Sequence, residues 1–139
     1  MGTTALLVVA SLGCAPSSFV RLRAAESDWR MIEFRPEMSR EEAWEDLVDT
    51  ISLKHDIEFM AKEAGYLRTG WMFTHYPSHG DRYRTRVVAK IPPDNDRVRV
   101  KVDALWLPPG SAHWRQGSDT DELDDVWGDL QGVIGRVRR

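Results

Sequence analysis

The chain has 139 residues, of which 42% are hydrophobic and six are tryptophan, and its formal net charge is −3. This length and apolar content predict one folded domain and exclude an intrinsically disordered chain. A single cysteine excludes an internal disulfide and a cysteine-rich zinc site, and the small negative charge gives no indication of a nucleic-acid partner.

The N-terminal segment 1–13 has no charged side chain and contains a short apolar run from Ala5 to Leu12. A membrane-spanning helix needs about 20 apolar residues, so this run is too short to be one. Its length is typical of the apolar part of a secretory signal. The only cysteine, Cys14, follows directly. The alternative interpretation is a disordered apolar terminus with an incidental cysteine.

Residues 12–15, Leu-Gly-Cys-Ala, resemble the lipobox of bacterial lipoproteins. In that family the cysteine sulfur receives a diacylglycerol, the leader is cleaved before the cysteine, and the new amine is acylated. Ser11 and Leu12 stand where the family usually has leucine and a small residue, and the leader lacks Lys and Arg. The resemblance implies that Cys14 is lipidated and attaches the protein to a membrane.

Residues 29–34 are an optional extra strand, and the first clear helix is 39–53. Ser39 followed by Glu42 is a capping-box pattern, in which the serine oxygen accepts a backbone N–H of the first turn. Spacing of apolar residues at i, i+3, i+4 and i+7 predicts one buried helix face. That face consists of Trp44, Leu47, Val48 and Ile51.

After this helix the apolar period changes from 3.6 to 2, which predicts strands. Residues 57–61 and 67–73 alternate around a glycine-containing turn, so they predict an antiparallel hairpin. A second hairpin is predicted from the alternation in 83–91 and 98–106, with the connection at 92–96.

Residues 108–117 are predicted to be a loop, after which Ser118 or Asp119 caps a C-terminal helix. Gly128 and Gly132 are four residues apart in this helix; they either allow a close approach to the sheet or only weaken the helix. The apolar stripe of the helix consists of Leu123, Val126, Trp127, Leu130, Val133, Ile134 and Val137.

These elements predict an α+β fold, a two-layer sandwich in which two helices cover one face of a four-stranded antiparallel meander. The expected organisation is a leader over 1–13, a lipidated cysteine and tether over 14–28, and one domain over 29–139. Trp71, Trp106 and Trp127 are expected to fill the core between the sheet and the helices.

The middle of the chain combines Ala43-Trp44 early in the helix, residues 56–59 and 62–67, and the strands at 83–91 and 98–107. This order of elements resembles the helix-grip domains of the BamC lipoprotein family of the outer-membrane β-barrel assembly machinery. The resemblance covers residues 29–139. BamC has two such domains after an unstructured segment, whereas this chain has one domain and almost no such segment. The resemblance implies a non-enzymatic interaction domain attached to the outer membrane.

Basic residues alternate with apolar ones along the predicted strands, so they are expected on the outward face of the sheet. Like charges on adjacent strands cost up to about 1 kcal/mol per pair, which suggests counter-charges or an anionic partner. Glu58, Glu63 and Asp103 are possible counter-charges; the alternative is a solvated face without a partner. The candidate residues are Arg68, Arg82, Arg84, Arg86, Arg97, Arg99 and Lys101, with Lys90 beside them.

No pattern in the sequence predicts a cofactor, a metal site or an enzyme. His75, His79 and Asp81, with His55 or His113, contain zinc-ligand types, but they occupy a loop without a defining spacing. No Gly-x-Ser-x-Gly elbow or similar nucleophile motif occurs.

The predicted function is therefore that of a non-enzymatic lipoprotein on the periplasmic face of the bacterial outer membrane, acting in protein interaction or envelope assembly. Its expected partners are the membrane, through Cys14, and an envelope protein or anionic lipid headgroups, but not nucleic acid. The alternative is a lipid or small-ligand carrier with a cavity between the sheet and the C-terminal helix, in which Trp114 would line the mouth.

Overall fold

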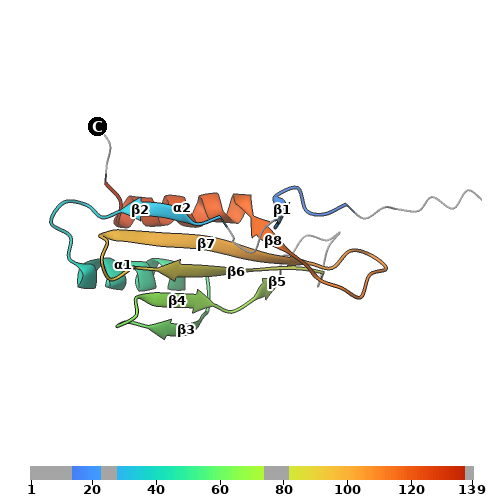
Figure 1. The fold of residues 1–139 in the computed structure, drawn as a ribbon, viewed down its shortest axis with the longest axis horizontal. Helices are drawn as coiled ribbons and strands as arrows, with labels where there is room; N and C mark the ends of the chain where they lie inside the picture. Colours follow the sequence, from blue (N-terminus) through green and yellow to red (C-terminus); the bar gives the residue numbers. More distant parts are fainter. Residues whose placement is uncertain (1–13, 23–27, 74–81, 137–139) are drawn as a thin grey trace, which may run out of the picture.

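The structure of the protein, a computed structural model, describes residues 14–22, 28–73 and 82–136 (Figure 1). In this part of the chain, eight strands form one antiparallel sheet. The predicted four-stranded meander is therefore wrong. The elements are β1 Phe19–Arg21, β2 Arg30–Glu33, α1 Arg40–Ser52, β3 Ile57–Ala61, β4 Tyr66–Thr69, β5 Met72–Phe73, β6 Tyr83–Lys90, β7 Arg97–Trp106, β8 Arg115–Asp119 and α2 Thr120–Val133.

The two longest strands, β6 and β7, form the centre of the sheet, paired from Tyr83 opposite Trp106 to Lys90 opposite Arg99. Beyond β7 the sheet continues with β8 and then β1, and beyond β6 it continues with β4 and then β3. The short strands β2 and β5 pair with the first halves of β7 and β6. This register confirms the predicted hairpin with its connection at 92–96.

The predicted continuous strand 67–73 is broken in the middle. β4 ends at Thr69, whose hydroxyl accepts a hydrogen bond from the Val87 N–H (2.9 Å) and donates one to the Gly70 carbonyl (3.2 Å). The Gly70 N–H donates to the Asp56 carbonyl (2.9 Å), so it leaves the ladder with β6. The chain resumes pairing only at Met72.

Residues 115–117 were predicted to be loop, but they belong to β8. The sequence of β8, Arg-Gln-Gly-Ser-Asp, has no apolar alternation that could reveal a strand. Backbone pairing defines it instead, since β7 lies on one side and β1 on the other. Short strands of this kind carry no periodic signal.

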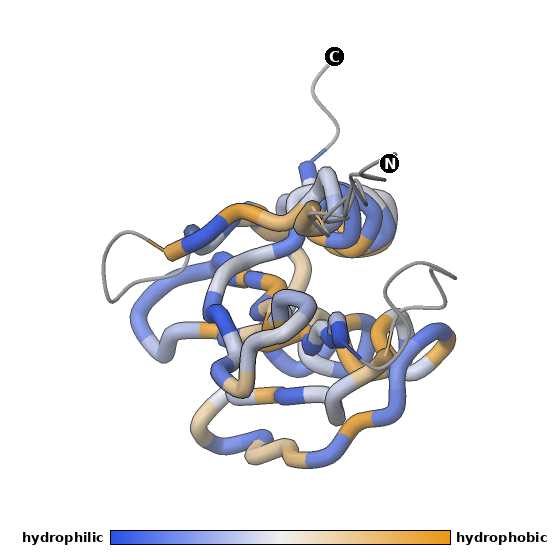
Figure 2. The backbone as a smooth tube through the Cα atoms, turned by 90° about the vertical axis from the view of Figure 1, so that its right-hand side faces the viewer, coloured by the Kyte–Doolittle hydropathy of each residue, from blue (hydrophilic) through white to orange (hydrophobic). Residues whose placement is uncertain are grey.

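Both helices pack against the same face of the sheet and share one apolar cluster with it. The alternation that produces this inner face is visible in Figure 2 as hydrophilic and hydrophobic residues following one another along the backbone. The predicted helix face is confirmed, since Trp44, Leu47 and Ile51 are buried. The most buried members from the strands and α2 are Ile32, Leu67, Val87, Val98, Val100, Val102 and Leu130.

Each helix begins at a side-chain cap. The Ser39 Oγ accepts the Glu42 N–H (3.1 Å), and the Asp119 Oδ1 accepts the Glu122 N–H (2.9 Å), so Asp119 rather than Ser118 caps α2. α2 ends at Val133, with its C-cap at the buried Ile134.

The segment predicted as a tether includes a strand of the sheet. β1 pairs with β8, with Phe19 opposite Asp119 and Arg21 opposite Gly117. Ser18 is buried; its hydroxyl donates to the Asp119 carboxylate (2.7 Å), and its carbonyl accepts the Thr120 N–H (2.9 Å). The ordered sheet therefore starts only a few residues after Cys14.

Replacing Gly65 by alanine is expected to lower the free energy of unfolding by about 2 kcal/mol. Gly65 has φ +63°, and an added Cβ would collide with the Ile91 carbonyl oxygen and lie 2.6 Å from the Arg40 guanidinium. Arg40 has little freedom to move, because it donates to the Ile91 and Pro92 carbonyls (2.6 and 2.7 Å). Urea denaturation measures the change.

The matched control is Gly128→Ala in α2. An added Cβ at Gly128 meets no atom within 4 Å, so Gly128 does not mark a close approach to the sheet. Alanine there is expected to raise the free energy of unfolding by about 0.5–1 kcal/mol, because glycine weakens a helix interior. Equal effects at the two positions would contradict this account of Gly65.

Candidate functional site

The outer face of the sheet, opposite the helices, carries a continuous set of basic side chains. The register places them there, since their neighbours in each strand, among them Val87, Val98 and Val102, point into the core. On β6 and β7 they lie on the same face, with Lys90 opposite Arg99 and Arg86 opposite Asp103. We call this set the basic sheet face; it consists of Arg68, Arg84, Arg86, Lys90, Arg97, Arg99 and Lys101.

Of the predicted candidates, only Arg82 lies beside this set rather than in it. Arg82 precedes β6, and its guanidinium donates to the Pro108 carbonyl (3.3 Å). It therefore ties the start of β6 to the loop after β7.

Indole rings lie against the cations of the basic sheet face. The Arg84 Cζ is 5.1 Å from the ring centre of Trp71 and 4.5 Å from that of Trp114, and the Arg86 Cζ is 4.5 Å from Trp71. Guanidinium–indole contacts within about 6 Å are attractive by about 0.5–1 kcal/mol at exposed sites. Arg84 is thus held between two indoles.

A second such contact occupies the middle of the face. Trp29, just before β2, lies 5.1 Å from the Lys90 Nζ and 5.0 Å from the Lys101 Nζ, and Tyr66 lies 5.7 Å from Lys90. Aromatic rings therefore separate basic side chains that would otherwise repel one another across the strands.

Three carboxylates neutralise part of the charge. Asp103 lies 3.3 Å from Arg86 and 3.2 Å from Lys101, and its role as a counter-charge is confirmed. Glu58 lies 3.7 Å from Arg68, as predicted, and Glu33 lies 3.6 Å from Arg97. Arg84, Lys90 and Arg99 have no ion-pair partner in the described ranges, so the face keeps an excess of positive charge.

A shallow pocket of about 240 Å³ opens on this face beside the Trp71–Arg86 contact. Its floor is β7, and its walls combine an indole with two cations, Arg86 and Lys101, and the amide of Gln116. Asp103 also lines the pocket and pairs with both cations, so the pocket is close to charge-balanced, and the excess positive charge of the face lies elsewhere.

The aromatic side chains on the basic sheet face were not predicted from the sequence. Trp71 was predicted in the core because it continues the alternation of Leu67 and Thr69, but the break after β4 turns it to the outer face. Trp114 was expected at the mouth of a cavity and instead stacks on Arg84. The core tryptophan is Trp44, with Trp127 packed against the cluster.

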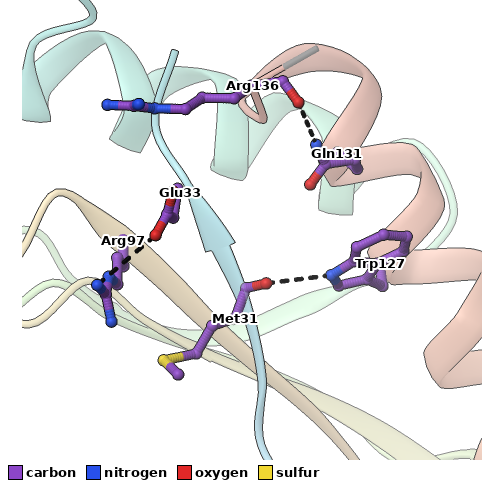
Figure 3. Close-up of a pocket in the computed structure, with 6 residues that line it drawn as sticks. All are labelled: Met31, Glu33, Arg97, Trp127, Gln131 and Arg136. Carbon is purple, nitrogen blue, oxygen red and sulfur yellow. Dashed lines mark hydrogen bonds and ion pairs between the residues drawn. The ribbon is translucent and has the colours of Figure 1, made fainter. Parts of the chain in front are cut away.

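A groove of about 550 Å³ lies between β2 and the second half of α2 (Figure 3). The Trp127 Nε1 donates to the Met31 carbonyl (3.3 Å), and the Gln131 amide donates to the Arg136 carbonyl (2.9 Å). The Trp127 bond ties α2 to the backbone of β2, and the open groove beside it has both polar and apolar walls. It lies between a strand of the sheet and the C-terminal helix, as the cavity of the carrier alternative would, but it is an open groove, and the apolar cluster fills the space deeper between the layers.

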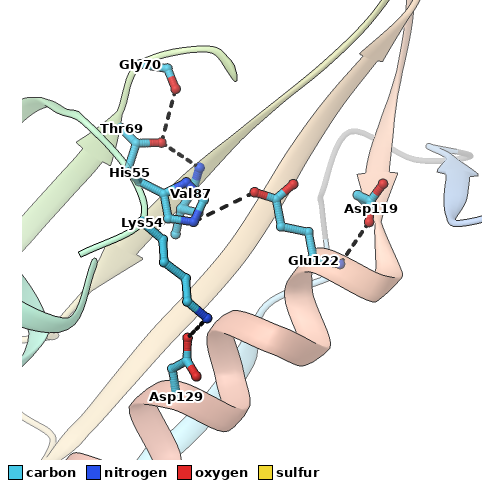
Figure 4. Close-up of polar contacts among 8 residues, drawn as sticks. All are labelled: Lys54, His55, Thr69, Gly70, Val87, Asp119, Glu122 and Asp129. Carbon is cyan, nitrogen blue, oxygen red and sulfur yellow. Dashed lines mark hydrogen bonds and ion pairs between the residues drawn. The ribbon is translucent and has the colours of Figure 1, made fainter. Parts of the chain in front are cut away.

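A buried polar cluster lies between the sheet and α2 (Figure 4). The His55 Nε2 is 3.8 Å from the Glu122 Oε1, and Asp119 accepts hydrogen bonds from the Ser18 and Tyr83 hydroxyls. The cavity beside His55 has a volume of only about 10 Å³, which is at most room for one water molecule. The cluster therefore offers no space for a substrate at His55.

Burial shifts two pKa values in this cluster in opposite directions. Burial, with the adjacent Lys54 charge, lowers the pKa of His55, and burial raises the pKa of the Glu122 carboxyl. The unfolded chain therefore binds a proton at His55 near pH 6.5 while the folded chain does not, so His55 makes the fold less stable as pH falls below that value. Glu122 has the opposite effect on stability. Its carboxyl binds a proton more tightly in the folded chain than in the unfolded chain, so its protonation stabilises the fold as pH falls.

His55→Gln is expected to reduce the loss of stability between pH 7 and about pH 5 relative to the unmodified protein. His113→Gln, the same substitution at an exposed position, is the control. Urea denaturation at a series of pH values measures both. If the free energy of unfolding of His55→Gln falls as steeply between pH 7 and about pH 5 as that of the wild-type protein, this result would contradict the burial of a neutral His55.

The described residues contain no group of three or more His, Cys, Asp or Glu side chains that could hold a metal ion. His75, His79 and Asp81 lie outside the described residues. No described helix has the length and apolar content to cross a membrane.

Comparison of the chain with models of known protein families gives no match, and a search of curated proteins gives none either. Its function therefore has to be inferred from the leader, the fold and the basic sheet face.

Proposed function

We propose that this protein is a lipid-anchored protein of the bacterial cell envelope whose domain binds an anionic partner and catalyses no reaction. The observation that carries the proposal is the position of Cys14. This sole cysteine is exposed, follows a charge-free apolar leader, and stands four residues before the buried Ser18.

The basic sheet face supports a binding role. Arg84 and Arg86 are held by indoles, so they are ordered before any partner arrives, and less side-chain entropy is lost on binding. Arg84, Lys90 and Arg99 have charge available for an anion. A surface of this kind favours a partner with several negative groups over a neutral one.

The buried polar cluster supports the non-enzymatic part of the proposal. Its carboxylate Asp119 accepts two hydroxyl hydrogen bonds and caps α2, which is a structural use of a buried charge. The cavity that His55 lines is too small for a substrate.

The proposed location is the periplasmic face of the outer membrane, with a role in protein interaction or envelope assembly. The lipobox-like sequence at 12–15 and the resemblance to the BamC lipoprotein family support this location and role.

Cell fractionation of a bacterial host tests the anchor. The wild-type protein should stay with the membranes through a high-salt wash, because salt removes electrostatic binding but does not release an acyl chain. Cys14→Ala should move to the salt wash or the soluble fraction. Membrane retention of Cys14→Ala at high salt would contradict the proposal.

A further inference from the structure

The two layers of the domain carry opposite charge. α2 has five carboxylates and no basic residue, and α1 has five carboxylates and one basic residue, Arg40. Among the described residues, the sheet's outer face has the seven cations of the basic sheet face, and three carboxylates pair with them, Glu33, Glu58 and Asp103. A protein with a net charge of −3 thus presents one strongly positive face.

Apolar side chains are exposed on the same positive face. Met31 lies opposite Arg99, Phe59 opposite Arg68 and Phe73 opposite Arg84. Their exposed fractions are 49%, 50% and 42%. Cations mixed with exposed aromatic and apolar side chains are typical of surfaces that rest on lipid headgroups, since the rings enter the interface and the cations meet phosphates.

The anchor position limits how the domain can sit. β1 is an edge strand of the sheet, and Ser18, which is bound to Asp119, stands four positions after Cys14. Four residues span at most about 14 Å, so a lipid on Cys14 would hold the sheet edge close to the bilayer. From that edge either the basic sheet face or the acidic helix layer can turn to the membrane.

Electrostatics decides between these orientations. Anionic lipids attract Lys and Arg near the surface and repel the carboxylates of α1 and α2. We infer that the basic sheet face lies on a bilayer and binds the phosphates of anionic phospholipid headgroups. In the cell this orientation rests on the proposed anchoring at Cys14, but the affinity of the face for anionic lipid does not.

Vesicle sedimentation with the full chain tests the inference without lipidation. The protein should bind vesicles of phosphatidylcholine with phosphatidylglycerol at low ionic strength, bind pure phosphatidylcholine at least tenfold more weakly, and be released by about 1 M salt. Cys14→Ala should bind as the unmodified chain does. Vesicle binding is therefore expected even if Cys14 is not lipidated in cells. Conversely, an absence of vesicle binding would contradict this inference but not the proposed lipid anchor.

Two charge-matched double variants locate the binding face. Arg97→Gln with Arg99→Gln removes two exposed cations of the basic sheet face and should weaken vesicle binding about thirtyfold, at roughly 1 kcal/mol per cation. Lys54→Gln with Lys62→Gln removes two exposed cations that pair with Asp129 and Glu41 on the helices, and should change binding less than threefold. Thermal unfolding by circular dichroism verifies that both variants fold.

Three outcomes would overturn the inference. The first is equal loss of binding in both double variants, and the second is equal binding to neutral and anionic vesicles. The third is release from anionic vesicles by millimolar inorganic phosphate or polyglutamate at constant ionic strength, which would make a free phosphate or an acidic protein the ligand of the face.

Discussion

Asp119→Ala is expected to lower the free energy of unfolding by about 4 kcal/mol, a factor of nearly a thousand in the unfolding equilibrium. The Asp119 carboxylate is buried and accepts hydrogen bonds from the Ser18 hydroxyl, the Tyr83 hydroxyl and the Glu122 N–H. Its loss removes the cap of α2, worth about 1 kcal/mol, and leaves two buried hydroxyls unpaired at about 1–3 kcal/mol each. Urea denaturation measures the change.

Ser39→Ala is the matched control, because Ser39 caps α1 through one hydrogen bond at an exposed position. It should cost about 1 kcal/mol. The two variants together distinguish a helix cap from a junction, since Asp119 binds the residue before β1, the Tyr83 hydroxyl of β6 and the first turn of α2. Similar losses in both variants would mean that Asp119 is only a cap.

Gly117→Val is expected to displace β1 from the sheet and to cost about 3 kcal/mol. A Cβ at Gly117 would collide with the Val20 carbonyl oxygen and lie 2.5 Å from the Phe19 ring. Phe19 in turn packs against Tyr83 and Trp106, with ring centres 6.0 and 5.9 Å apart. Displacement of β1 therefore also breaks an aromatic contact.

Limited trypsin digestion checks this prediction, because a displaced β1 exposes the bond after Arg21. Gln116→Val is the control, since Gln116 is an exposed residue of the same strand and valine favours strands. Cleavage at Arg21 should be faster in Gly117→Val than in Gln116→Val. Equal cleavage rates with unchanged stability would show that β1 tolerates a side chain at 117.

The periodic elements of the fold could be predicted from the sequence. The face of α1, with Trp44, Leu47 and Ile51, and the hairpin of β6 and β7 follow from apolar spacing alone. The short strands could not, because β1, β5 and β8 have two to five residues each and are defined by backbone pairing with distant segments. The predicted meander had four strands, with one optional strand over 29–34 that corresponds to β2, whereas the described residues form eight.

The cations of the candidate surface could be predicted, and their aromatic partners could not. Because side chains alternate between the two faces of a strand, the apolar alternation along β6 and β7 is enough to place Arg86 and Lys101 on the outer face. The position of Trp71 depends on the turn at Gly70, which Thr69 makes through side-chain hydrogen bonds to the backbone. Trp29 and Trp114 lie outside regular elements, so no period indicated their contacts.

Intact-mass spectrometry of the protein extracted from bacterial membranes tests the central claim, the lipid anchor, most directly. The account predicts a chain that begins at Cys14 and carries a diacylglycerol and an amide-linked acyl group. A chain that retains residues 1–13 with an unmodified Cys14 sulfur would contradict it.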